Sequence, residues 1–586
     1  MDIFIVIVYF TFLILIGWFF RKFTSSTSDY FRGSGKMLWW MVGATAFMTQ
    51  FSAWSFTGAA GKAFTDGLAV LIIFLGNAIG YFGNYLFFAE KARQMRVVTP
   101  MEGIRLRYGK LNEQVFTWAT VPSSILSSGI ALNALAIFVS AVTNIPMSTT
   151  IIVTGIIVIL IAVSGGSWAI ISSNFLQMVI VMSVSIIASI IAIWKSGGVV
   201  PLFQKGLPPM PIAGHDINYM FLFVAWTLAV FAKQFFSTNS ITTSYRYISA
   251  KDSKNAKKAA LLACILMLIG PVIWFIPDWF VAGNFPNPST WGLNTLGKNI
   301  KDATYFVFVR NELPNGMVGL MLAAMFASTM PSMDTGLNTN TGIFVRSFYK
   351  AIINTTANEK RLMIVSKIST LVFGSLIIFS GLLLNSMQNT SLFNKMMMVG
   401  TLVTFPVLIP SLLGFFVKKT PDWAGWGTIL VGACVSYFVA FIANPQMIQH
   451  LLGLPNPLTD REWGDMHSMT LPIILHLTIT LPFYLISQLF YKGYSEEREK
   501  EVNLFFNNVS TKVIADHENE VATDNHQRKI LGKLIIVVGI CIFTLTLIPN
   551  NLSGRLIFVA VSAIVSLIGI VLVKSIPKDK TTVTQK

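Results

Sequence analysis

Charged residues are scarce in this 586-residue sequence. Asp, Glu, Lys and Arg together make up 12% of it, whereas 54% of the residues are hydrophobic and the mean hydropathy is +0.65. A soluble domain needs more polar side chains to cover its surface, so this composition excludes a soluble globular protein. Apolar runs of about 20 residues, each long enough to cross a hydrocarbon core of about 30 Å, recur along almost the whole chain. We therefore predict an all-α integral membrane protein.

Cysteine is also scarce, and the motifs of enzyme chemistry are missing. The three cysteines, Cys264, Cys434 and Cys541, all lie within apolar runs, which excludes a disulfide framework and metal-ligand spacing. The sequence has no nucleophile–base pair, no phosphate-binding loop and no cluster of metal-ligating residues. It therefore predicts no enzymatic activity.

Acidic residues are fewer than basic ones, and the formal net charge is +17. If the N-terminus lies outside, the inward loops hold roughly three times as many Lys and Arg residues as the outward loops, as the positive-inside rule requires. The inward loops are 21–36, 91–112, 246–258, 346–361 and 418–419, and the outward loops are 62–67, 195–216, 284–315 and 444–467. The charge thus reports topology and predicts no nucleic-acid partner. We expect a multi-pass protein of the cell (inner or plasma) membrane with a cytoplasmic C-terminus.

Hydropathy predicts about fifteen spans. They are 2–20, 37–62, 68–90, 113–142, 149–165, 167–195, 217–245, 259–283, 316–348, 361–384, 393–418, 422–443, 468–491, 530–549 and 554–573. We divide the chain into an N-terminal extra helix and loop (1–36), a transport core (37–420), two accessory helices (421–491), a charged linker (492–529) and a C-terminal helix pair with its tail (530–586). Because the linker is highly charged, we expect it to be mobile and cytoplasmic.

Three spans carry polar clusters that ordinary lipid-facing helices lack. They are the second span, the seventh span at 237–244 and the ninth span at 328–341. Polar groups at membrane depth are costly unless they line a cavity, bind an ion or mediate helix packing. The second and seventh spans are five apart and run in opposite directions. This spacing indicates an inverted repeat in which two discontinuous helices meet near the midplane.

Five sequence segments resemble those of the sodium:solute symporters, a family of sodium-coupled sugar, proline and sialic-acid carriers. They are Trp-Trp-Met-Val-Gly-Ala (39–44), Gly-Gly-Ser-Trp-Ala (165–169) with Ser-Asn-Phe-Leu-Gln (173–177), Tyr-Arg-Tyr-Ile-Ser-Ala-Lys (245–251), the run 323–338, and Phe-Val-Lys-Lys-Thr (416–420). The resemblance covers about two-thirds of the chain. It implies a leucine-transporter-type inverted repeat of 5+5 helices, with one N-terminal and about four C-terminal extra helices.

The resemblance also implies a site for Na⁺, the coupling ion. Carried over by position, its ligands are the backbone carbonyls of Met48, Phe51 and Ser328 and the side chain of Ser332. Pro331 has no N–H to donate, so it frees a carbonyl one turn earlier, and oxygen ligands suit a hard cation. Pro331 itself replaces a hydroxyl that many relatives use as a ligand, so the site is either weaker or completed by Thr329 or water.

A carboxylate occupies an unusual position in the ninth span. Relatives often hold an aspartate in the sixth span, where this chain has Asn174, whereas here Asp334 replaces their hydroxyl residue. We assign both residues to the ion-binding set, where they bind a cation or a proton. The alternatives for Asp334 are a structural hydrogen bond or a pair with Lys233.

The predicted substrate set is Ser55, Phe74, Asn77, Lys233, Phe236 and Met397. Where sugar-carrying relatives place polar contacts, this chain has Ile73, Phe74, Met267 and Met397, which cannot hydrogen-bond a hexose. A small carboxylate or amino acid is therefore favoured over a sugar. Lys233 lies mid-span and has three interpretations: a counter-ion for an anionic substrate, a salt bridge to Asp334, or a replacement for a second cation.

The resulting function is sodium-coupled import of a small organic solute by alternating access. The alternatives are a sodium-coupled sugar carrier, and a membrane sensor or uncoupled facilitator built on the same core. The expected partners are the solute, sodium and the lipid bilayer, with no obligate protein partner.

Overall fold

The computed structural model describes residues 5, 6, 8, 9, 11, 35–164, 167–207, 217–387, 391–514 and 517–576. This part of the chain is almost entirely helical, and twelve of its helices are long and apolar enough to cross a membrane. Two more of the expected spans are present in other forms. The second span is broken, and the fifth is a shorter apolar helix. The first expected span, the 165–166 pair and the tail beyond 576 lie largely outside the described residues.

The first repeat follows the predicted 37–195 segment. Its helices are α3 (Trp39–Met48), α4 (Gly58–Asp66), α5 (Leu71–Gly83), α6 (Ala89–Gln94), α7 (Pro100–Tyr108), α8 (Lys110–Thr143), α9 (Met147–Ser164) and α10 (Ser167–Lys195). A short 3-10 turn, η3 (Ala53–Phe56), lies between α3 and α4.

The second repeat follows a short outer helix, α11 (Val199–Gly206). Its helices are α12 (Ile217–Asn239), α13 (Tyr245–Ile248), α14 (Ser253–Trp274), α15 (Ile276–Asn284), α16 (Thr304–Glu312), α17 (Met317–Ile343), α18 (Glu359–Ser386), α19 (Leu392–Met398) and α20 (Phe405–Leu413). A 3-10 turn, η6 (Ile241–Thr243), separates α12 from α13, and a π-helical turn, η10 (Val399–Thr404), joins α19 to α20.

The two repeats pack reciprocally. The first membrane helix of each repeat packs on the second membrane helix of the other repeat. Thus α3 packs on α14, and α12 packs on α5. Glycines allow this close approach: a Cβ on Gly43 would lie 2.9 Å from the Ala259 carbonyl, and one on Gly80 would lie 2.3 Å from Thr238 Oγ1. The exchange confirms the inverted repeat predicted from the spacing of the second and seventh spans.

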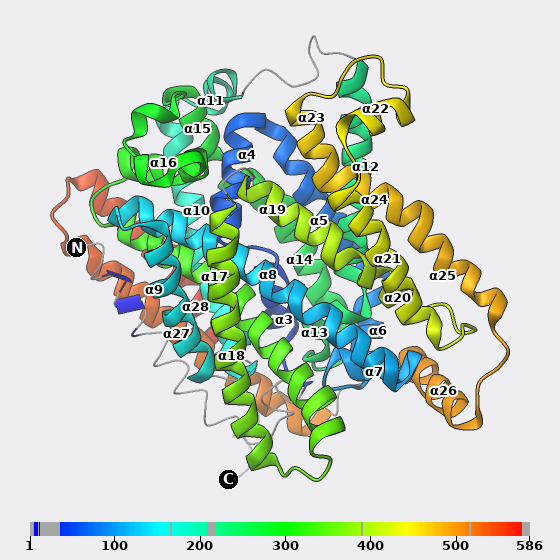
Figure 1. Ribbon diagram of the computed structural model, residues 1–586. Coiled ribbons are helices and arrows are strands. Elements are labelled where there is room, and N and C mark those ends of the chain that lie inside the picture. Colours follow the sequence, from blue (N-terminus) through cyan, green and yellow to red (C-terminus); the bar gives the residue numbers. More distant parts are fainter. Residues whose placement is uncertain are drawn as a thin grey trace, which may run out of the picture.

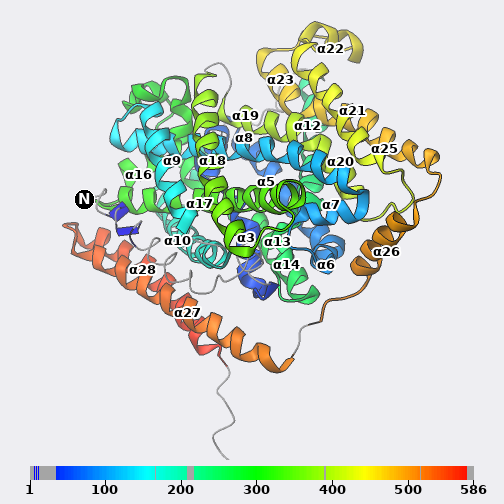
Figure 2. The same cartoon turned by 60° about the horizontal axis from the view of Figure 1, so that its bottom comes forward.

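The remaining helices extend the C-terminal part. They are α21 (Trp423–Phe441), α22 (Pro445–Leu452), α23 (Asp460–Asp465), α24 (Leu471–Leu475), α25 (Leu481–Ser487), α26 (Glu496–Ser510), α27 (His517–Thr544) and α28 (Leu552–Lys574). A π-helical turn, η11 (Met466–Thr470), joins α23 to α24. Helices α27 and α28 form a hairpin that packs beside α10 at the edge of the bundle (Figure 2).

The predicted loop sets separate to opposite ends of the bundle. Helices α11, α16, α22 and α23, all from predicted outward loops, lie at one end, and α6, α7 and α26 lie at the other (Figure 1). We call these the outer and inner ends, following the charge distribution of the loops. The central polar spans run between them.

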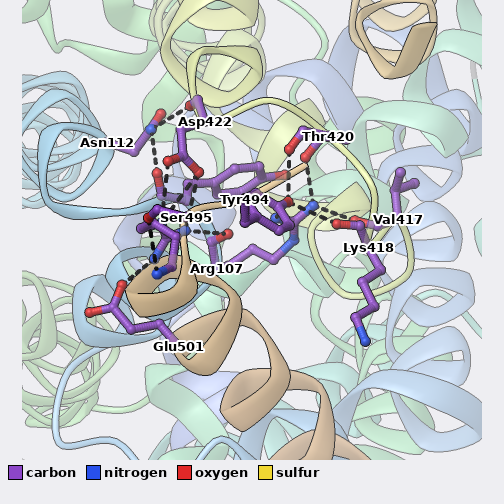
Figure 3. A network of polar contacts seen from close by, with 11 residues as sticks. Arg107, Asn112, Val417, Lys418, Thr420, Asp422, Tyr494, Ser495 and Glu501 are labelled. Carbon is purple, nitrogen blue, oxygen red and sulfur yellow. Dashed lines mark hydrogen bonds and ion pairs between the residues drawn. The ribbon is translucent and has the colours of Figure 1, made fainter. Parts of the chain in front are cut away.

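The charged linker differs from expectation, because part of it forms a docked helix. Helix α26 buries Val502, Phe505 and Val509, and the last two belong to an apolar cluster that includes residues of α7. At its start, Arg498 pairs with Asp422 at 3.2 Å and the Tyr494 hydroxyl donates to the Thr420 carbonyl at 2.7 Å (Figure 3). This segment is therefore an ordered inner brace, since apolar burial and an ion pair hold it to the core.

Candidate functional site

The second span breaks between α3 and η3. Ser52 is extended, with φ −147° and ψ 179°, and its hydroxyl accepts a hydrogen bond from the backbone N–H of Trp54 at 3.3 Å. Among the described residues, no hydrogen-bond donor is found for the backbone carbonyls of Met48 and Phe51. Both residues are fully buried. The break therefore presents two carbonyl oxygens without internal partners.

The seventh span breaks in the same way between α12 and η6. Ser240 is extended, with φ −85° and ψ 160°, and side chains of other helices hold the chain on either side of it. Asn84 donates to the Thr238 carbonyl at 2.7 Å, and Ser411 accepts from the Thr242 backbone N–H at 2.9 Å. Two discontinuous helices, as predicted from the polar clusters, thus lie in the core.

Helix α17 lies directly against the first break. The backbone N–H of Ala53 donates to Thr329 Oγ1 at 3.1 Å, and the Thr329 hydroxyl donates to the Met325 carbonyl at 2.9 Å. Thr329 thereby joins the break to α17, and its hydroxyl already accepts one hydrogen bond and donates another. It is less suited to completing an ion site than the sequence suggested.

The predicted ligands on α17 retain free oxygen capacity. The Ser332 hydroxyl donates to the Thr329 carbonyl at 2.8 Å, which leaves its oxygen lone pairs available, and its side chain lines the central cavity. Pro331 does not interrupt the helix, so the carbonyl that loses its usual N–H partner is that of Ala327. Ser328 is fully buried, and its hydroxyl donates to Met325. The ligand roles of Met48, Phe51, Ser328 and Ser332 stay predictions.

A cavity of about 260 Å³ lies between the two breaks, α5, α8, α17 and the α19–α20 span. Four members of the predicted substrate set line it: Phe74, Asn77, Lys233 and Met397. Ser55 and Phe236 do not line it, and neither does Met267. No Asp or Glu is among the described residues that form its wall. The cavity is therefore lined by polar and apolar groups and cations, without carboxylates.

Lys233 is partly buried, and among the described residues its side chain has a neutral hydrogen-bond partner. Its Nζ donates to Gln234 Oε1 at 3.2 Å, and a Cβ on Gly400 would lie 2.9 Å from its Cε, so Gly400 provides the space that Lys233 occupies. No ion pair joins Lys233 to Asp334. The salt bridge considered from the sequence is therefore wrong for this structure, because the two side chains face different surroundings.

Asp334 points away from the cavity. It is 5% exposed, its Oδ1 has no hydrogen-bond partner among the described residues, and it lies close enough to the Tyr9 hydroxyl to interact electrostatically. Gln177 of α10 donates to that hydroxyl at 3.3 Å. Asn174, one turn earlier on α10, donates to Thr45 Oγ1 at 3.4 Å. Asp334 and Asn174 thus lie in the α10 side of the core, separate from the solute cavity.

Arg246 of α13 is a cavity residue that sequence reasoning missed. It is 5% exposed and lines the cavity beside Tyr245 and Thr243. The available signal was its place in the 245–251 segment, which served only to support the resemblance. Among the described residues, no group of three or more His, Cys, Asp or Glu is placed to hold a metal ion.

Comparison with known proteins agrees with this geometry. The solved structure of a Na⁺-coupled sialic acid symporter in a substrate-bound outward-open state superposes with a TM-score of 0.64 at 20% identity, covering 82% of this chain and 97% of that one. The sodium/glucose cotransporter 4 of Danio rerio is 25% identical over 475 residues, which cover 74% of this chain and 70% of that protein. The osmoregulated proline transporter OpuE of Bacillus subtilis is 22% identical over 446 residues, which cover 73% of this chain and 86% of that protein.

These findings define a multi-pass membrane transporter of the leucine-transporter fold. The model of the sodium:solute symporter family matches residues 30–432, which is more than half of the sequence. The chain belongs to the sodium:solute symporter family, whose members are transporters.

Proposed function

We propose that this protein is a sodium-coupled symporter that imports a small organic solute with a carboxylate group, either a carboxylic acid or an amino acid. One observation carries the substrate class: among the described residues, the partly buried Lys233 in the central cavity has no hydrogen-bond partner other than the neutral Gln234, and no carboxylate lines the wall. A buried charge without a counter-ion costs several kcal/mol. An anionic group on the solute would remove that cost at the moment of binding.

The rest of the cavity favours the same class over a sugar. Ile73, Phe74 and Met397 line it and offer no hydrogen bonds to the hydroxyl groups of a hexose. Asn77 also lines the cavity, and its Oδ1 has no partner among the described residues. The rest of the wall carries many Ser and Thr hydroxyls, further amides such as Gln50 and Asn340, and a second cation, Arg246. A cavity with hydroxyls, amides and cations but no carboxylate on its described wall suits a small solute that carries a carboxylate.

Sodium coupling rests on the oxygens around the first break. The carbonyls of Met48 and Phe51 lack internal donors, and Ser332 faces the same cavity with free lone pairs. Asp334 is a second candidate for ion or proton binding, at the α10 side of the core. Sodium as coupling ion also agrees with family membership.

The cavity reaches the inner end, where Met101, Arg246 and Ile343 form part of its wall. At the outer end the Trp54 ring stacks on Phe393 with centroids 5.6 Å apart. We therefore assign this arrangement to an inward-facing state of an alternating-access cycle, with the N-terminus outside.

Uptake into proteoliposomes tests the proposal. A panel of radiolabelled monocarboxylates, amino acids and neutral hexoses is offered with an inward sodium or potassium gradient. We expect sodium-dependent accumulation of an anionic or zwitterionic solute. Lys233→Gln should abolish sodium-dependent solute uptake while retaining ²²Na⁺ binding, whereas Lys254→Gln, which neutralises an exposed cation on α14, should transport normally. Wild-type solute affinity in Lys233→Gln would refute the anionic substrate.

The second candidate is a sodium-coupled sugar carrier, because relatives include sodium/glucose and sodium/myo-inositol cotransporters. Sodium-driven accumulation of a hexose in the same panel would favour it. Accumulation that ignores the sodium gradient would favour a facilitator, and binding without transport would favour a sensor.

A further inference from the structure

The cavity contains a second buried cation at its inner end. Arg246 is 5% exposed and its guanidinium Nε and Nη1 have no hydrogen-bond partner among the described residues. The groups that act on it electrostatically are the tyrosines Tyr81, Tyr245 and Tyr247, and the Tyr245 side chain is also within hydrogen-bonding reach of the guanidinium. The Tyr245 ring lies 5.5 Å from the guanidinium carbon. An aromatic cradle stabilises a cation but does not neutralise it.

No acidic residue balances this charge. The ion pairs of the described residues do not include Arg246, and the cavity wall around it, from Met101 to Thr243 and Ile343, carries no carboxylate. Arginine presents its N–H groups as a planar fork that matches a carboxylate, so two unused donors at 5% exposure indicate a missing anion.

Arg246 and Lys233 occupy different parts of the cavity. Six residues of α12 lie between Lys233 and the end of the helix at Asn239, about 9 Å at the α-helical rise, and the break at Ser240 then separates α12 from α13. Lys233 therefore lies before the break, and Arg246 lies beyond it toward the inner end.

We propose that Arg246 forms an inner anion site, which binds the carboxylate of the solute after it leaves Lys233 and before it reaches the cytoplasm. This inference rests on the proposed anionic substrate for its physiological ligand. The site itself is defined by Arg246, Tyr245 and Thr243 and binds a carboxylate through the free Nε and Nη1 of the guanidinium. Because a second cation follows Lys233, the carboxylate of the solute keeps a positively charged partner as it moves from Lys233 toward the cytoplasm.

Formate, the smallest carboxylate, is the probe. Binding of [¹⁴C]formate to the full chain in lipid nanodiscs is measured by scintillation proximity at constant sodium. We expect two formates per chain in the wild type and in Lys254→Gln, one in Lys233→Gln, one in Arg246→Gln, and none in the double variant. Arg246→Lys retains the charge but loses the fork, so its inner site should bind formate about tenfold more weakly.

The outcomes separate the two proposals. If adding Arg246→Lys to Lys233→Gln weakens binding of the remaining formate about tenfold, the inner site is supported even if Arg246→Gln fails to fold. One formate in the wild type that only Arg246→Gln removes supports the inner site and contradicts the role of Lys233. Unchanged binding in Arg246→Gln and Arg246→Lys overturns the inner site. Displacement of the inner formate by an equal concentration of chloride would assign the site to inorganic anions and overturn the carboxylate assignment.

Discussion

The hydroxyl of Ser332 connects local hydrogen bonding with the proposed ion chemistry. Because it donates to the Thr329 carbonyl, its oxygen can accept a cation from the cavity side. The hydroxyl of Ser328 has a different role, since it donates to Met325 while the predicted ligand is the Ser328 backbone carbonyl. Two serines one turn apart on α17 thus offer a matched pair, in which alanine removes a ligand oxygen from one and only a local hydrogen bond from the other.

We expect Ser332→Ala to raise the sodium concentration for half-maximal uptake about tenfold, equivalent to about 1.4 kcal/mol. Ser328→Ala should change it by less than about twofold, because the carbonyl remains. Initial uptake rates in proteoliposomes over a sodium series, with protein incorporation measured for each variant, provide the comparison. Equal sodium dependence in the two variants would show that the ion does not contact Ser332.

At the scale of single residues, the sequence predicted which residues line the cavity better than it predicted which side chains contact one another. Phe74, Asn77, Lys233 and Met397 all line one cavity, because they lie on spans that the inverted repeat brings to the centre. The proposed pair of Lys233 with Asp334 failed, because a sequence does not give the helical face that each side chain takes after packing. Resemblance transfers positions, whereas partners depend on side-chain direction.

Among the elements, the two broken helices were predictable because polar residues at membrane depth need a compensating role. Helix α26 was not predicted. Its first six residues are all charged, and the three buried apolar positions that follow, Val502, Phe505 and Val509, are spaced by three and four residues. That spacing is the signal for an amphipathic helix, but it is short and lies within a charged segment.

Helix α26 should act as a brace whose loss frees the inner end locally. Phe505 is fully buried and Leu504, its neighbour, is 51% exposed, so Phe505→Ala removes core contacts and Leu504→Ala does not. Truncating a buried Phe costs on the order of 3–5 kcal/mol, whereas exposed changes stay within about 0.5 kcal/mol. Hydrogen exchange of 496–510 should therefore accelerate at least about a hundredfold in Phe505→Ala. Similar exchange in both variants would contradict the brace.

At the scale of the whole molecule, ion pairs connect α4 with α23 at the outer end. Lys62 Nζ lies 2.7 Å from Asp66 and 3.1 Å from Asp465, and Arg461 Nη2 lies 2.9 Å from Asp66. Lys62 also lies over the Phe393 ring at 5.2 Å. Helix α4 follows the first break, so these contacts connect the candidate ion site with the outer end.

In the proposed inward-facing arrangement, the ion pairs between α4 and α23 hold the outer end together. An alternating-access carrier must close one end when the other opens, and a partly exposed ion pair contributes about 1 kcal/mol or less to that choice. A change of about 1 kcal/mol shifts a two-state population about fivefold. The ion pairs between α4 and α23 are therefore weak enough to be broken when sodium and solute bind. A deeply buried ion pair would be harder to break.

Asp465→Asn should shift the population toward the outward-open state. The change removes one partner of Lys62, while Asp460→Asn removes the same charge from an exposed residue of α23 that has no ion pair among the described residues. In a background with the three native cysteines replaced by serine, Ser52→Cys places a reporter on the cavity wall. We expect Asp465→Asn to increase labelling by an impermeant maleimide, applied from outside, by up to about fivefold, and Asp460→Asn to leave it unchanged. Because saturating sodium and solute would favour the outward-open state of both proteins, the difference should be largest in their absence. An equal rate in the two variants would mean that the Lys62–Asp465 pair does not hold the outer end closed, and that closure depends on the Trp54–Phe393 stack instead.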